Sequence, residues 1–215
     1  MGAPCVRLGD RYCINSFPKP TNKQLHFYLD IPLLGQINER YGTQYTFRDL
    51  WQELFKPSSF LEDNLAHLAP NLPKKYVSVC FRHLNAFGDT PELFFKAVSK
   101  EQQEELLMRC KRQIKTIQDE CGLPAVVTAD SLVFLRALEG MEGVHTVLQT
   151  NKVVHMGYDA SADISSYLQS FLDFYALTSG VKVIQVNSPL QNRVSGFPYM
   201  AAVCGGKEFT VVTMQ

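Results

Sequence analysis

The sequence has no long apolar run and no excess of charge of either sign. No stretch approaches the roughly 20 consecutive apolar residues that a membrane-spanning helix needs, and the opening MGAPCVRLGD lacks the apolar run of a signal peptide. The 21 basic residues are balanced by 21 acidic residues, whereas a nucleic-acid binder normally carries a basic excess. We therefore expect a cytoplasmic protein with no membrane span and no nucleic-acid partner.

Common catalytic and metal-binding motifs are missing as well. No GxGxxG follows a strand-like segment, and neither a GxxxxGKS/T phosphate loop nor a GxSxG nucleophile motif is present. The five histidines show no ligand spacing and the six cysteines form no CxxC pair, so we expect no metal, no cofactor and reduced thiols. The missing glycine fingerprint leaves a nicotinamide-dependent enzyme as a disfavoured alternative.

What is present is the composition of an ordinary globular protein, with 46% hydrophobic and 20% charged residues. A chain of 215 residues is most simply one domain with an appendage. Prolines punctuate residues 1–72, where we expect an irregular, mainly helical segment. Its helices are expected over 46–55, with Thr46 as N-cap, and over 63–68.

Residues 73–215 contain five short strand-like segments that alternate with amphipathic helices. The strands are expected at 76–81, 125–130, 144–148, 181–186 and 209–214. The helices are expected from Ser99, with Gln102 completing a capping box, to Gly122; over 131–138; from Asp163 to Gly180; and over 198–204. In the third helix the apolar spacing predicts that Ile164, Leu168, Phe171, Leu172 and Tyr175 face inward. The alternation predicts an α/β fold with a doubly wound parallel sheet.

Right-handed crossovers place every loop that follows a strand along one edge of such a sheet, where ligands bind. Arg82 follows the first strand directly, and its guanidinium can hold a phosphate with two parallel hydrogen bonds. The alternative is a surface arginine that pairs with Asp89. His83, beside it, is a packing or polar-rim residue, and the alternative is a catalytic base.

Two aspartates and one helix start are the other candidates. Asp130 ends the second strand and either caps the helix that begins at Ser131 or faces a ligand. Asp173 interrupts the apolar run FLDFYAL, so its carboxylate is solvated on a polar face or bound to something specific. Ser195 and Gly196 present a hydroxyl and backbone amides at a helix N-terminus, which favours phosphate oxygens; the alternative is a plain loop with a capped helix.

Three segments in order resemble the GDP-fucose-dependent fucosyltransferases, namely the α1,6-, NodZ-like and protein O-fucosyltransferases, which share a metal-independent GT-B fold. VSVCFRHLNAFGD is similar to the family's strand followed by an HxR segment, and VTAD to its strand ending in T-D-D. FLDFYALTSGVKVIQVNS with SGFPYMAA is similar to its third motif, a helix with an aspartate, a strand, a serine and a helix with alanine. The resemblance covers about residues 70–210.

The resemblance implies roles for individual residues. Arg82 matches the arginine that contacts the donor diphosphate, and Asp130 matches the last acid of the second motif. Asp173 then recognises the guanine, and either Ser188 or Ser195 contacts the phosphates.

Two positions depart from the family pattern. Cys80 stands in place of the family histidine, and His83 in place of a second arginine that some members have. With this substitution His83 is still expected at the donor site, together with Gly196.

The implied function is metal-independent transfer of a sugar from a nucleotide-sugar donor, of GDP-fucose type, to a hydroxyl of an unknown glycan or other acceptor. Residues 73–215 are then a Rossmann-like donor-binding domain of GT-B type. Residues 1–72 are then a remnant or part of the acceptor side, which a partner chain would complete. The alternative is a truncated, non-catalytic nucleotide-binding or scaffold module.

Overall fold

The computed structural model describes residues 33–89, 96–148, 167–188 and 193–214. The chain divides into two compact units, Met1–Leu54 and Phe55–Gln215. The division falls earlier than the expected boundary at residue 72, because helix α3 (Ser59–Leu68) packs into the second unit. Leu68 of that helix is buried in one cluster with Tyr76 and Leu172.

The first unit contains helix α1 (Leu33–Tyr41), which the sequence patterns do not predict, and helix α2 (Phe47–Leu54). The predicted N-cap of α2 is confirmed, since the backbone N–H of Asp49 donates to Thr46 Oγ1 at 3.2 Å. The Asp49 carboxylate accepts the backbone N–H of Thr46 in return at 2.8 Å. The two bonds satisfy backbone donors at the start of the helix.

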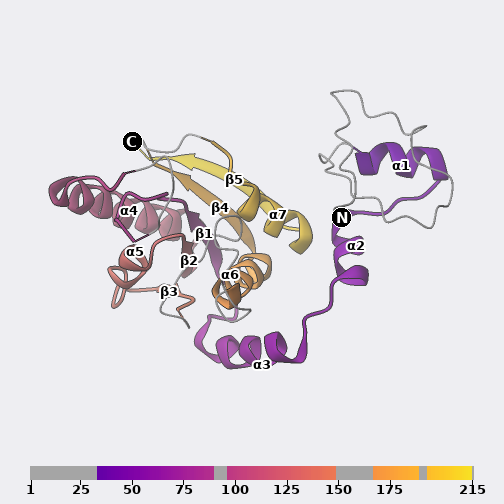
Figure 1. Ribbon diagram of the computed structural model, residues 1–215, viewed down its shortest axis with the longest axis horizontal. Helices are drawn as coiled ribbons and strands as arrows, with labels where there is room; N and C mark the ends of the chain where they lie inside the picture. The colour runs from indigo at the N-terminus through magenta and orange to yellow at the C-terminus, as the bar shows by residue number, and fades with distance from the viewer. Residues whose placement is uncertain (1–32, 90–95, 149–166, 189–192, 215) are drawn as a thin grey trace, which may run out of the picture. The chain divides into compact units, whose positions relative to one another are not determined.

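The second unit is built on five parallel strands, which confirms the predicted α/β class (Figure 1). The strands are β1 (Val77–Phe81), β2 (Ala125–Ala129), β3 (Val144–Thr146), β4 (Lys182–Asn187) and β5 (Glu208–Thr213). Their order across the sheet is β3-β2-β1-β4-β5.

Helices cover both faces of this sheet (Figure 1). They are α3 (Ser59–Leu68), the short 3-10 turn η2 (Ala69–Asn71), α4 (Lys100–Cys121), α5 (Leu132–Arg136), α6 (Leu168–Ser179) and α7 (Gly196–Gly205). Helices α4 and α5 lie on one face, where Ile114 and Phe134 are fully buried against Val79 and Val127. Helices α6 and α7 lie on the other, with α3 packed beside α6. Successive side chains of the central strands point to opposite faces of the sheet, so they contribute to two apolar layers.

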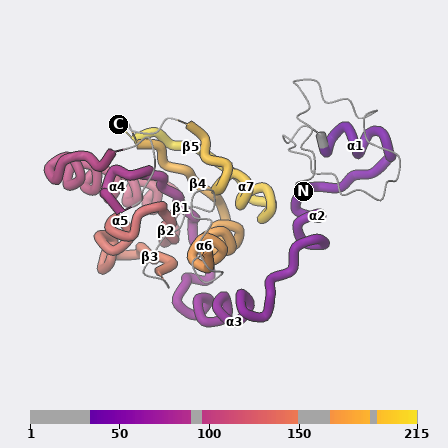
Figure 2. Tube along the Cα trace, viewed as in Figure 1, coloured from indigo at the N-terminus to yellow at the C-terminus, as the bar shows by residue number. Residues whose placement is uncertain are grey.

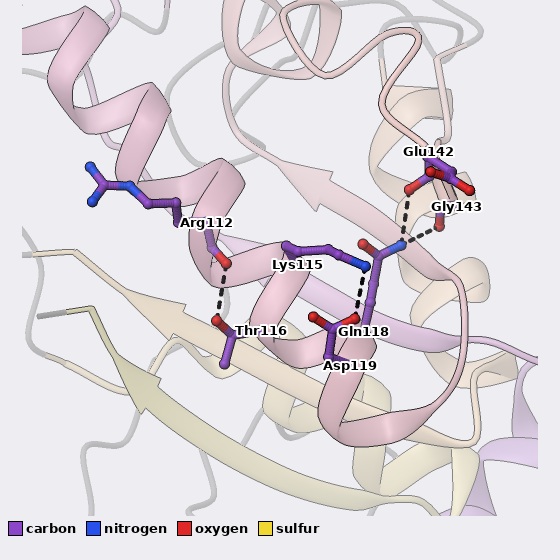
Figure 3. A network of polar contacts seen from close by, with 7 residues as sticks. All are labelled: Arg112, Lys115, Thr116, Gln118, Asp119, Glu142 and Gly143. Atoms are coloured by element: carbon purple, nitrogen blue, oxygen red, sulfur yellow. Dashed lines mark hydrogen bonds and ion pairs between the residues drawn. The ribbon is translucent and has the colours of Figure 1, made fainter.

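The predicted ends of α4 are confirmed. Ser99 and Gln102 form a reciprocal capping box, and Gly122 closes the helix in a left-handed conformation with φ of 62°. Near that end, the Gln118 side chain donates to the carbonyls of Glu142 at 3.2 Å and Gly143 at 2.8 Å (Figure 3). These bonds fix the turn that leads into β3, so the long helix also positions a sheet edge.

Helix α6 presents a different face to the core than its apolar spacing predicts. Phe171 is 43% exposed, whereas Gln169 and Asp173 are buried together with Leu172 and Ala176. The prediction that Phe171 faces inward is wrong, because two polar residues occupy the buried face and displace the apolar pattern. The expected cap Asp163 and Ile164 lie outside the described residues.

Gly180, at the turn from α6 into β4, tolerates no side chain. An added Cβ would overlap the Ser78 hydroxyl and lie 3.2 Å from the Ser78 backbone nitrogen. The hydroxyl is itself fixed by bonds to the carbonyls of Ala176 and Leu177. We expect Gly180→Ala to lower the free energy of unfolding by about 2 kcal/mol in urea denaturation. Gly196→Ala is the control, since its methyl group would meet no atom within 4 Å; equal stability of the two variants would contradict this packing.

Candidate functional site at the carboxyl ends of β1, β2 and β4

The strand order creates a topological switch point at the carboxyl edge of the sheet, and the region outside the ends of β1 and β4 is called the crevice below. Strands β1 and β4 are neighbours, yet the helices that follow them, α4 and α7, lie on opposite sides of the sheet (Figure 2). Ligands bind in parallel sheets at such switch points. Phe81 pairs with Ala129 on one side and Val186 on the other. Arg82, Asp130 and Asn187 therefore lie at neighbouring positions along this edge.

The charges of three predicted residues act on Cys80, the second-to-last residue of β1. The pKa of the Cys80 thiol is raised to about 12, since burial and the carboxylates of Asp130 and Asp173 raise it more than the bond with Thr128 and the Arg82 guanidinium lower it. Charges act on one thiol in this way only when they lie close to it. The charges of Arg82, Asp130 and Asp173, which come from a strand end, a neighbouring strand end and a helix, thus all lie within reach of Cys80.

Arg82 is half-buried at the start of the loop after β1. The predicted alternative, a pair with Asp89, is not formed. Asp89 Oδ2 instead accepts the Ser131 hydroxyl at 3.0 Å and the backbone N–H of Val133 at 2.8 Å, at the start of α5. The charge of Arg82 acts on Asp130 and Cys80 at the crevice.

Asp130 holds the loop that carries Arg82. Its Oδ1 accepts the backbone N–H of His83 at 2.6 Å, and its Oδ2 accepts that of Leu84 at 2.9 Å. Leu84 has a φ of 57°, a left-handed conformation that a leucine rarely adopts and that such bonds can impose. The predicted capping role is wrong, since the Ser131 hydroxyl caps α5 by accepting the N–H of Phe134 at 3.1 Å.

The pKa of Asp130 reflects its buried position next to this loop. Burial raises its pKa to about 6, while the bond from His83 and the charge of Arg82 oppose that shift. The Asp130 carboxylate therefore fixes the backbone of the loop that carries Arg82 and keeps the Arg82 guanidinium close to the crevice.

His83 is a packing residue, which is one of the alternatives that the sequence leaves open. The residue is 1% exposed, and its ring stacks on Phe81 at 5.5 Å between centroids and packs against Phe134 at 4.3 Å and Phe87 at 4.9 Å. Burial lowers its pKa to about 3, so the ring is neutral at physiological pH. The imidazole packs in the apolar layer under α5, and its expected contact with a donor stays a prediction.

The carboxylate of Asp173 is buried, and its Oδ1 accepts a hydrogen bond. Gln169 Nε2 donates to Asp173 Oδ1 at 2.9 Å and also to the carbonyl of Val147. Within the described residues, Oδ2 receives no hydrogen bond. Burial raises the pKa of Asp173 to about 8, because charge is poorly solvated there. The predicted alternative, a solvated polar face, does not fit a residue that is 5% exposed.

Gln185 is a structural residue of the site that the sequence patterns do not identify. Its Oε1 accepts the backbone N–H of Ser195 at 2.8 Å, and its Nε2 donates to Asn187 Oδ1 at 2.5 Å and to the carbonyl of Arg193 at 2.8 Å. The only signal in the sequence is a polar residue within the apolar strand VKVIQV. Gln185 ties the loop before α7 to the floor of the crevice.

Gln185→Leu should therefore loosen this loop. The leucine leaves the N–H of Ser195 and the carbonyl of Arg193 without their partner, so we expect the free energy of unfolding to fall by about 3 kcal/mol. Urea denaturation measures this loss, and Gln52→Leu, at an exposed position of α2, is the control. A loss no larger than that of the control would show that the bonds of Gln185 contribute nothing.

The two candidate serines lie at opposite ends of the loop after β4. Ser188 follows β4 directly and is 2% exposed. Ser195 is the N-cap of α7, but its hydroxyl makes no capping bond to the helix. Gly196 is exposed at the first helical position, and a side chain there would meet open space. Backbone N–H groups of the first turn and the Ser195 hydroxyl can thus receive an anion at the crevice.

In the part of the chain that the structure describes, no group of three or more potential metal ligands comes together. No helix among the described residues is long and apolar enough to cross a membrane. Comparison with models of protein families gives no match, and comparison with curated proteins gives none either.

Proposed function

We propose that the crevice between β1 and β4 binds the diphosphate of a nucleotide sugar, and that the chain is the donor-binding part of a metal-independent, fucosyltransferase-like glycosyltransferase. The second unit corresponds in this proposal to the Rossmann-like donor domain of the GT-B fold. The acceptor is a hydroxyl of a glycan or another molecule.

One observation carries the proposal. The guanidinium of Arg82 directly follows β1. The N-terminus of α7, where the Ser195 hydroxyl makes no capping bond, follows the adjacent strand β4. Arginine and helix N-termini are two of the groups that proteins use most often to hold phosphate. Their placement on both sides of a switch point favours a diphosphate over a single small anion.

The buried carboxylate of Asp173 supports a purine base as the other end of the ligand. An ionised carboxylate accepts two parallel N–H bonds, and a guanine presents such a pair of donors along one edge. Pairing with these donors would favour the ionised form of Asp173, offsetting the desolvation that raises its pKa to about 8. This match, together with the resemblance of the FLDFYAL segment, favours GDP over UDP or ADP.

In the transfer step the oxygen of the acceptor hydroxyl attacks the anomeric carbon and the bond from that carbon to the diphosphate breaks, while the hydroxyl proton passes to the departing diphosphate or to water. The bonding electrons pass to the diphosphate, whose negative charge grows as it departs. Arg82 and the first-turn amides of α7 stabilise this charge without a metal ion. Asp130 acts as a positioning residue, since its bonds to the loop hold Arg82 in place.

Calorimetric titration with GDP, GDP-fucose, UDP and ADP tests the proposal. We expect the two guanine nucleotides to bind at least tenfold more tightly than UDP and ADP, in buffer that contains EDTA. Absence of heat with all four ligands contradicts a nucleotide-sugar site. Equal binding of all four contradicts the assignment of the base to Asp173 and leaves the diphosphate site in place.

A non-catalytic nucleotide-binding module is favoured by one feature, the identity of residue 80. The family histidine is replaced by a thiol whose pKa is raised to about 12, so that it is neutral and chemically quiet. Release of GDP from GDP-fucose, with and without mixed glycan acceptors, separates the two functions. Binding without any release supports the module, and turnover supports the enzyme.

A further inference from the structure

Strand β5 is an exposed edge of the sheet. Among the described residues it is hydrogen-bonded to β4 on one side and to no strand on the other. Edge strands are commonly protected by lysine, proline or a bulge. The sequence of β5, EFTVVT, has none of the three, and Val211 at its centre is 36% exposed. This edge is therefore suited to pair with another strand.

The orientation of the free backbone groups follows from the ladder with β4. The N–H of Met214 donates to the carbonyl of Asn187 at 3.0 Å. Successive residues of a strand direct their backbone groups to opposite sides, so Phe209, Val211 and Thr213 direct theirs away from β4. An added strand would bond to these three residues.

The side of the sheet that faces α4 has a hollow next to the end of β5. It is lined by Arg109, Arg112, Gln113 and Thr116 of α4 and by Val212, Thr213 and Met214. Arg112 is exposed, and within the described part of the chain its guanidinium makes no ion pair; its carbonyl accepts the Thr116 hydroxyl at 3.1 Å (Figure 3). Arg109 lies 3.9 Å from Glu105. The hollow thus carries positive charge beside the free edge.

Glu208, at the other end of β5, carries the complementary charge on the same side of the sheet. Its side chain is 67% exposed, and its Oε1 contacts both Lys182 Nζ at 2.8 Å and the Thr210 hydroxyl at 3.3 Å. Within the described part of the chain Oε2 makes no ion pair, so it can take a further cation. In an antiparallel pair of two β5 strands, this end of one strand lies beside the opposite end of the other.

We infer that β5 pairs antiparallel with β5 of a second copy of this chain, so that Glu208 of the partner subunit enters the hollow beside Arg112. A two-fold axis perpendicular to the sheet keeps the α4 sides of both copies together, so only residues of the same side can lie opposite each other. With Val211 opposite its own copy, Phe209 faces Thr213 and Glu208 faces Met214, a lining residue of the hollow. The symmetry forms the Arg112–Glu208 contact twice.

A cycle of charge reversals in the full chain tests this interface. Sedimentation velocity should find the wild type as a dimer at micromolar concentrations. Arg112→Glu and Glu208→Arg should each weaken the dimer at least tenfold, because like charges then meet in the hollow. The double variant should restore it. A monomer at all concentrations, or a dimer that forms equally in the single variants, overturns the inference.

Crosslinking tests the register. In Val211→Cys the two new thiols lie opposite each other across the axis, at a Cα separation that suits a disulfide. We expect a covalent dimer after mild oxidation, beyond the background of the native cysteines. Val133→Cys, an exposed position on α5, is the control. Equal crosslinking of the two variants overturns the proposed pairing.

Discussion

Arg82→Ala is expected to weaken the binding of GDP by about 100-fold while the chain stays folded. A charged group that donates two hydrogen bonds to phosphate contributes more to affinity than a neutral one, about 1.5 to 3 kcal/mol for each bond. Arg82 is half-buried and follows the last residue of β1, so we expect the apolar core to survive its truncation. Calorimetry measures the affinity, and circular dichroism confirms the fold.

Two further variants make the result specific to the guanidinium. Arg82→Lys keeps the charge but loses the bidentate geometry, so its affinity should lie between those of wild type and alanine variant. Arg136→Ala removes an exposed arginine of α5 and should leave GDP binding unchanged. Equal affinity of the wild type and Arg82→Ala would remove Arg82 from the site.

Asp173→Asn is expected to stabilise the fold at alkaline pH and to weaken binding of guanine nucleotides at least tenfold. The pKa of Asp173 is about 8 in the folded chain, above the ordinary 3.8. Between these two values the unfolded chain releases a proton that the folded chain keeps. The folded chain therefore loses stability as pH rises from about 4 to about 8 and loses no more above that. The loss amounts to several kcal/mol at most.

Asparagine has no such proton, so its advantage over the wild type grows across the same pH range. Urea denaturation at pH 5, 7 and 9 measures it. Asp119→Asn, at an exposed position of α4, is the control and should follow the wild type. Parallel stability profiles for wild type and Asp173→Asn, or unchanged affinity for GDP, would contradict a buried carboxylate kept for a ligand. Gain of stability with loss of binding is the signature of a functional residue.

The fold was predictable from the sequence because its signals are local. The capping box at Ser99 and Gln102, the terminating Gly122 and the five apolar segments each depend on neighbouring residues only. The position of α6 along the chain was predicted, but its buried face was not, because the inward position of Gln169 and Asp173 contradicts their polarity. The exception coincides with the candidate site, where such local rules are expected to fail.

The internal supports of the site depend on contacts between distant residues and were not predictable. Asp130 bonds to the backbone of His83 and Leu84, which lie 47 and 46 positions earlier. His83 follows a strand tip that faces the crevice, yet its ring turns into the aromatic layer with Phe134. Sequence adjacency to Arg82 predicts a shared role for His83; the packing of the loop separates the two side chains.

Titration of the ¹⁵N-labelled chain with GDP, followed by amide resonances, tests whether β1 and β4 share one diphosphate site. We predict that the amides of Arg82, Ser195 and Gly196 shift together and saturate with a single Kd, while that of Gly143, at the distant edge of the sheet, does not move. Shifts confined to one of the two strand tips, or clustered around Arg112, would contradict a diphosphate site shared by β1 and β4.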